Sequence, residues 1–116
     1  MGKRSRRQRL KAPESTYAGA DGDELVLRGS MTPATRQQYA EVLAGSPLSR
    51  EDAWQRGVEF LFERLVVSWS IAGVEPITRQ KELLARFRVS SQDERAWIRD
   101  VLREHLAEHF PELEAP

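Results

Sequence analysis

The stretch of residues 49–73, SREDAWQRGVEFLFERLVVSWSIAG, has the strongest apolar pattern in the chain, and the prediction of the fold starts from it. On a helical wheel at about 100° per residue, its polar side chains share one narrow strip, whereas two other faces are apolar. Ser49 precedes the pattern with Asp52 three residues later, which approximates a capping box. We therefore predict a central helix over residues 50–72 that other elements cover on two sides.

Start and stop residues predict three more helices. Thr32 is an N-cap residue before Pro33, whose fixed φ suits the first turn, and Gly45 is expected to end that helix in a left-handed conformation. Thr78 is the expected cap of a short helix, and a capping box that opens at Ser91 begins the last one. The four helices are expected at residues 33–44, 50–72, 79–88 and 92–110.

Residues 16–28 have the pattern of a short β-hairpin. Two runs of strand-forming residues flank Asp21 and Gly22. Asp-Gly is favoured where both central residues of a turn need a positive φ, and this preference gives the prediction its physical basis. Because a two-stranded ribbon is only marginally stable by itself, we expect the hairpin to pack on the helices.

The 116 residues are enough for one hydrophobic core and too few for two large ones. Residues 1–14 contain one large apolar side chain beyond Met1, that of Leu10, which is too little to offset the entropy lost on ordering them. The expected fold is mostly α. It is a compact four-helix bundle-like domain over residues 15–116, with the hairpin attached and a disordered basic arm at the N-terminus.

Composition excludes several classes of protein. The chain has no cysteine, so disulfides, thiolate catalysis and cysteine-ligated metal sites are excluded. No apolar run approaches the roughly 20 residues that a membrane-spanning helix needs. Pro13 and Glu14, rather than an apolar segment, follow the basic start, so no secretory signal is expected. These features predict a cytoplasmic protein without membrane association.

Charge is distributed unevenly along the chain, although the formal net charge is zero. Six basic residues precede the first acid, Glu14, and residues 15–116 carry 12 basic against 17 acidic side chains. A basic arm of this kind neutralises phosphates with little sequence preference, and it has no aromatic side chain to stack on bases. We therefore expect it to contact the phosphate backbone of RNA or DNA. Its basic residues are Lys3, Arg4, Arg6, Arg7, Arg9 and Lys11.

Arg95, Arg99 and Arg103 stand at successive i+4 positions of the last predicted helix and form a secondary basic stripe. A stripe of this kind can follow phosphates. Four acids nearby in the sequence can also neutralise it, and the pattern favours a solvated, ion-paired helix face. These acids are Asp93, Glu94, Asp100 and Glu104.

The string HLAEH at residues 105–109 matches the H-x-x-E-H pattern of one class of zinc protease. His105 and His109 share a helix face and could hold zinc while Glu108 activates water. Such a site also needs a third protein ligand and a substrate cleft, and few residues follow the motif. Both histidines fall inside the apolar arc of their helix, so we predict semi-buried side chains at the core edge and no bound metal. A metal contact, a pH switch or a partner surface is the alternative.

The chain has no phosphate-binding glycine loop, nucleophile elbow or catalytic pair of carboxylates, so we predict neither an enzyme nor a cofactor. The first functional hypothesis is a non-catalytic, nucleic-acid-associated protein whose basic arm binds phosphates while the helical body is a docking module. The alternative is a protein–protein adaptor or assembly factor that presents apolar helix surface to a partner or to a second copy of itself. A metal-dependent hydrolase is a distant third.

Overall fold

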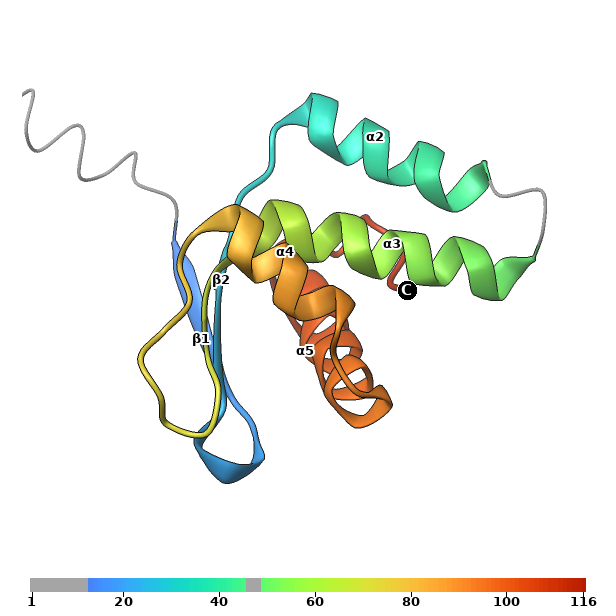
Figure 1. Cartoon of the computed structure of the whole chain (residues 1–116). Coiled ribbons are helices and arrows are strands. Elements are labelled where there is room, and N and C mark those ends of the chain that lie inside the picture. Colours follow the sequence, from blue (N-terminus) through green and yellow to red (C-terminus); the bar gives the residue numbers. More distant parts are fainter. Residues whose placement is uncertain (1–12, 46–48) are drawn as a thin grey trace, which may run out of the picture.

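The structure, a computed structural model, describes residues 13–45 and 49–116. These residues contain three antiparallel strands and four α-helices (Figure 1). The mostly helical fold and the hairpin agree with the prediction, whereas the third strand is new. The strands are β1 (Glu14–Ala18), β2 (Glu24–Arg28) and β3 (Val66–Ser70). The helices are α2 (Pro33–Ala44), α3 (Arg50–Leu65), α4 (Gln80–Arg88) and α5 (Gln92–His109).

The hairpin of β1 and β2 is confirmed. The two strands pair in antiparallel register, with Thr16 opposite Val26, and a 3-10 turn at Ala20–Gly22 joins them. Asp21 and Gly22 have φ angles of 59° and 82°. Both residues therefore adopt the left-handed conformation that favours Asp-Gly at this position.

The folded body begins slightly earlier than predicted. Pro13 and Glu14, which we expected in the basic arm, belong to the body, because β1 starts at Glu14. The backbone N–H of Gly29 also donates a 2.7 Å hydrogen bond to the carbonyl oxygen of Pro13. Pairing with β2 thus extends the ordered backbone to this point. The rest of the predicted arm, residues 1–12, lies outside the described residues.

The chain leaves the helical conformation earlier than predicted. The helix expected over residues 50–72 ends at Leu65 as α3, and the next five residues form β3 instead. β3 pairs antiparallel with β2, which becomes the central strand of the sheet. The β-branched side chains of Val66 and Val67 suit a strand, and hydrogen bonding to β2 decides the conformation.

A register shift in the pairing of β2 with β3 explains why this strand has a helix-like sequence. Val66 and Ser68 pair with consecutive residues of β2, so Val67 is an extra residue in β3. One extra residue reverses the faces that the later side chains occupy. Val66 and Trp69 are therefore both buried although they stand three positions apart, a spacing typical of a helix.

The capping predictions for α2 and α5 are confirmed. Thr32 caps α2 with its hydroxyl, and Ser91 and Glu94 form the capping box of α5. The predicted left-handed end of α2 is wrong, because Gly45 has a φ of −91°. A Cβ atom at this position would lie 2.9 Å from the carbonyl oxygen of Glu41. Close backbone approach, rather than a positive φ, therefore explains the glycine.

The predicted cap of α4 at Thr78 is wrong. The N-cap residue is Arg79, and it makes no side-chain capping hydrogen bond. The segment before the helix explains the difference, because Ile77 and Trp69 of β3 form two backbone hydrogen bonds with each other. The segment before α4 therefore continues along the sheet, and the helix starts only after it.

α3 is the central helix, as predicted, and it packs against the other three helices and β3. Figure 1 shows α2 alongside α3, with α4 and α5 on another side of it and the sheet beyond its C-terminal end. The core joins the helices to the sheet, since its fully buried side chains include Leu25 of β2, Phe62 of α3 and Trp69 of β3. Because the sheet shares this core, the expected four-helix bundle is not confirmed.

Candidate functional site

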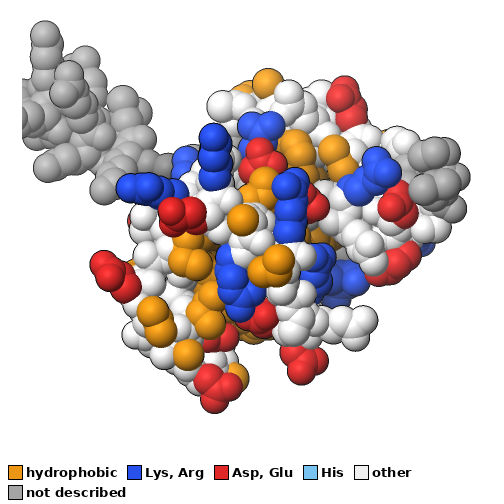
Figure 2. Space-filling model, in the orientation of Figure 1, with side chains coloured by type: hydrophobic (Ala, Val, Ile, Leu, Met, Phe, Trp, Pro, Cys, Tyr) orange, Lys and Arg blue, Asp and Glu red, His pale blue; other side chains and the backbone are white. Residues whose placement is uncertain are grey.

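A groove of about 290 Å³ lies between α3 and α5 and reaches the last turn of α4. Trp54 and Val58 of α3, Phe87 of α4, and Arg95 and Arg99 of α5 line it, and together they define the α3–α5 groove. Val58 and Phe87 are buried, Trp54 and Arg99 are partly exposed, and Arg95 is exposed. Figure 2 shows basic and hydrophobic side chains interleaved over the middle of the face on which α4 lies in Figure 1.

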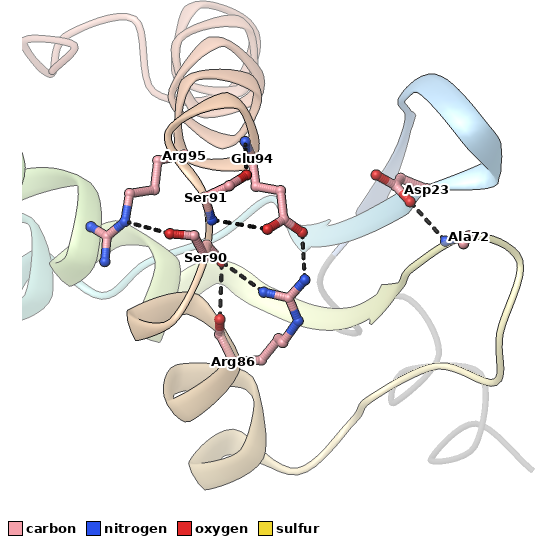
Figure 3. A network of polar contacts seen from close by, with 7 residues as sticks. All are labelled: Asp23, Ala72, Arg86, Ser90, Ser91, Glu94 and Arg95. Atoms are coloured by element: carbon pink, nitrogen blue, oxygen red, sulfur yellow. Dashed lines mark hydrogen bonds and ion pairs between the residues drawn. The ribbon is translucent and has the colours of Figure 1, made fainter.

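The junction between α4 and α5 holds Arg95 at the groove (Figure 3). Its Nη2 donates a 3.0 Å hydrogen bond to the carbonyl oxygen of Arg88, and its Nε donates a 3.4 Å bond to that of Ser90. The guanidinium carbon lies 4.9 Å from the centre of the Phe87 ring. In the described part of the chain, no carboxylate forms an ion pair with Arg95. Among the described residues, its partners are therefore neutral and supply no counter-charge.

A second arginine, Arg86, makes polar contacts across the same junction. Its guanidinium donates to the hydroxyl of Ser90 at 3.1 Å and to the carboxylate of Glu94 (Figure 3). It also lies 5.1 Å from the centre of the Trp69 ring. The backbone N–H of Ser91 is the main cause of the lowered pKa of Glu94, and Arg86 lowers it further. These polar groups satisfy one another and thereby fix the start of α5.

Arg99 lies one turn further along α5 and is less well satisfied. Its guanidinium carbon is 5.9 Å from the centre of a Trp54 ring, and its ion pair with Glu51, across the groove, is long at 3.9 Å. Its Nε is shielded from solvent and has no hydrogen-bond partner among the described residues. A shielded donor without an acceptor costs free energy. Arg99 therefore offers a charge that the fold leaves poorly compensated.

The three arginines of the predicted basic stripe do not all lie at one site in the structure. Arg95 and Arg99 reach the groove, whereas the Nε of Arg103 donates a 2.7 Å hydrogen bond to the backbone oxygen of Pro116. None of the ion pairs among the described residues joins these arginines to an acid of the same helix. Within the described residues, Arg99 pairs with Glu51 of α3, and no acid pairs with Arg95 or Arg103. Two arginines, rather than three, thus form one site.

His105 and His109 connect α5 to the hairpin. His105 is fully buried, and its Nε2 donates a 2.8 Å hydrogen bond to the carbonyl oxygen of Arg28. The neutral ring therefore accepts the hydroxyl of Tyr17 at Nδ1, also at 2.8 Å. His109 Nε2 lies 3.0 Å from the hydroxyl oxygen of Ser15, and the two imidazole centres are 4.5 Å apart. Burial is the main cause of the lowered pKa of His105.

These contacts assign the two histidines a place in the packing of the body. His109 is partly exposed, as predicted, whereas His105 is more deeply buried than predicted. Among the described residues, no group of three or more histidines and acids could hold a metal ion. Zinc binding by His105 would also require the loss of one of its two hydrogen bonds. The H-x-x-E-H string therefore lacks the geometry of a metal centre here.

The aromatic lining of the groove is the part of the site that sequence reasoning missed. Trp54 and Phe87 belong to helices other than that of Arg95 and Arg99, so only tertiary packing brings the four together. The i, i+4 spacing of the two arginines was the one signal in the sequence. The predicted arm residues Lys3, Arg4, Arg6, Arg7, Arg9 and Lys11 lie outside the described residues.

Comparison of the chain with protein-family models, with curated proteins and with solved structures found no match. Within the described residues, none of the helices has the length and apolar character needed to cross a membrane. The distribution of charge and the geometry of the groove are therefore the basis for inferring a function.

Proposed function

We propose that the protein is a non-catalytic, RNA- or DNA-associated binding protein that contacts the phosphate backbone through its N-terminal residues. The segregation of charge along the chain is the observation that supports this function. Six basic side chains and no acidic one precede Pro13, whereas residues 14–116 carry 12 basic and 18 acidic side chains. The six phosphate-contacting residues are Lys3, Arg4, Arg6, Arg7, Arg9 and Lys11.

This charge distribution directs a polyanion to the N-terminal segment. The acidic body repels phosphates, and the basic segment attracts them over about one Debye length, roughly 8–10 Å near physiological salt. Neutralising six phosphates of duplex DNA gives a slope of about −5 in a plot of the logarithm of the association constant against the logarithm of salt concentration. Such binding has little sequence preference, because phosphates carry no base information.

The body in this proposal is a docking module for a protein partner or for a second copy of the chain. The body begins at Pro13 and β1, where the N–H of Gly29 donates a hydrogen bond to the carbonyl oxygen of Pro13. Since the six basic residues precede β1 in the chain, the surface of the body remains for binding another molecule.

The test is a fluorescence-anisotropy titration of labelled single-stranded RNA and labelled duplex DNA, from about 50 to about 200 mM salt. Replacing all six N-terminal basic residues with Gln is expected to abolish binding. The matched control replaces two exposed basic residues of the body, Arg79→Gln with Lys81→Gln, and should keep the affinity within about twofold, since these residues are outside the proposed contact. Undiminished binding by the Gln-substituted chain would overturn the proposal.

A further inference from the structure

We infer that the α3–α5 groove binds a short acidic peptide segment of a partner protein. An apolar side chain of the peptide packs over Val58 and beside Trp54, and a carboxylate lies between Arg95 and Arg99. This inference goes beyond the nucleic-acid contact proposed above, because it concerns another part of the chain and another class of ligand. It gives the protein-binding alternative a specific surface.

The floor of the groove is apolar. Val58 and Phe87 are only 7% and 2% exposed, and the partly exposed Trp54 lies beside them. Ala96, a small exposed residue of α5, also lines the groove and leaves room beside the two arginines. At about 290 Å³, the groove is near the small end of ligand sites. This size suits one or two peptide side chains better than a large cofactor.

The charge of the groove is complementary to a carboxylate. Arg95 has two carbonyl oxygens and no carboxylate as partners, and Arg99 has a 3.9 Å ion pair with Glu51 and an Nε without an acceptor, all within the described residues. Residues 14–116 carry 18 acidic and 12 basic side chains, so acids that could pair with an arginine are abundant elsewhere on the body. An Asp or Glu of a partner supplies the charge that is missing here, because guanidinium–carboxylate hydrogen bonds are strong.

Both arginine side chains are already positioned for this contact. The carbonyl oxygens of Arg88 and Ser90 hold Arg95, which lies over Phe87, and Arg99 lies over a ring of Trp54. Ordering a long side chain on binding costs free energy, and a side chain held in place beforehand avoids much of that cost. The groove therefore has the rigidity of a recognition site.

The same observations favour a peptide over a nucleic acid in this groove. A base would stack on an aromatic ring, but Arg95 and Arg99 already lie over the rings of Phe87 and Trp54. The side chain of Glu51, 64% exposed on the opposite wall, repels every phosphate of a strand that runs along the groove, whereas a peptide brings a single carboxylate to the two arginines. A peptide can place one carboxylate at the arginines and turn its apolar side chain toward the floor.

The experiment is selection of phage-displayed random short peptides on the full chain, followed by anisotropy measurements on the enriched peptides. We expect peptides in which Asp or Glu is close to Leu, Phe or Trp. Arg95→Gln and Arg99→Gln should each weaken them about tenfold, as expected for the loss of a charge-assisted hydrogen bond. Arg103→Gln is the matched control, because Arg103 lies on the same helix outside the groove, and it should leave the affinity unchanged.

A second pair of variants keeps the test valid if loss of Arg95 disturbs the junction. The exposed Ala96 has no side-chain polar contact to lose, so Ala96→Glu and Ala96→Arg should both keep the melting temperature. The Glu variant should weaken the enriched acidic peptides several-fold, and the Arg variant should strengthen them. An equal response to both substitutions would overturn the inference.

The remaining outcomes are equally decisive. Enrichment of basic or purely apolar peptides, or failure to enrich any, overturns the inference, as does RNA binding that depends on Arg95 and Arg99. The chain whose six N-terminal basic residues are replaced by Gln should bind the acidic peptides with full affinity. A failure of the nucleic-acid proposal is thus distinguishable from a failure of this one.

Discussion

Polar side chains on the two sides of α5 differ in whether the fold supplies partners for their hydrogen-bonding groups. On the side that faces the sheet, His105 is fully buried and both of its ring nitrogens have hydrogen-bond partners. On the side that faces α3, Arg99 keeps a shielded Nε without an acceptor, and Arg95 has no carboxylate among the described residues. Polar groups that the fold satisfies stabilise it, whereas groups that it leaves unsatisfied are available to a partner. The comparison thus distinguishes the residues of α5 that the fold satisfies from those that we propose bind a partner.

The core between these two sides should give the largest effect. Leu102 of α5 is completely buried, so Leu102→Ala is expected to lower the free energy of unfolding by about 2–5 kcal/mol through lost burial and a residual cavity. Glu104→Ala, at an exposed position of the same helix, should change it by less than about 0.5 kcal/mol. Chemical denaturation measures both values. A similar small change in both variants would show that α5 is not packed in this way.

Substitutions on the side of α5 that faces the sheet, where His105 has both of its hydrogen-bond partners, should give the next largest loss of stability. His105→Ala leaves the carbonyl oxygen of Arg28 and the hydroxyl of Tyr17 without their partner and should cost about 1–3 kcal/mol of unfolding free energy. Tyr17→Phe removes only one of these two hydrogen bonds, so its cost should be smaller, about 1 kcal/mol. Denaturation of both variants tests the order. A larger loss for Tyr17→Phe would contradict the role assigned to His105.

His105, on this same side of α5, should make the stability of the chain depend on pH. Burial lowers the pKa of His105, so the folded chain binds this proton less readily than the unfolded chain, in which histidine titrates near pH 6.5. The free energy of unfolding should therefore fall as the pH drops from about 7 to about 5. Denaturant titrations at a series of pH values measure the slope, and His105→Gln should flatten it. An unchanged slope in this variant would assign the pH dependence to other groups.

Substitution of Arg99, on the side of α5 that faces α3, should give the smallest effect on stability. Arg99→Gln removes a 3.9 Å ion pair and a guanidinium whose Nε has no acceptor, so the free energy of unfolding should change by less than about 0.5 kcal/mol. The affinity for acidic peptides should nevertheless fall about tenfold, as argued above. Thermal denaturation together with peptide titration tests this contrast. A loss of stability above about 1 kcal/mol would place Arg99 among the structural residues.

Local signals in the sequence predicted the elements that short-range contacts stabilise. The Thr32 cap predicted the start of α2, the capping box predicted the start of α5, and Asp21-Gly22 predicted the turn between β1 and β2. Each of these signals acts within a few residues of itself, so the rest of the fold hardly alters it. The i, i+4 spacing of Arg95 and Arg99 likewise placed both arginines on one side of a helix.

Long-range contacts decided what those signals could not. Residues 66–70 are a strand only because β2 offers a hydrogen-bonding edge, and the extra residue Val67 gives that strand the burial spacing of a helix. The groove depends in the same way on packing, since it combines side chains from α3, α4 and α5. The sequence by itself therefore determined the starts of α2 and α5, the turn at Asp21-Gly22 and the charge of each segment. Only the tertiary structure decided which of those charges are satisfied, because satisfaction depends on partners that lie far away in the chain.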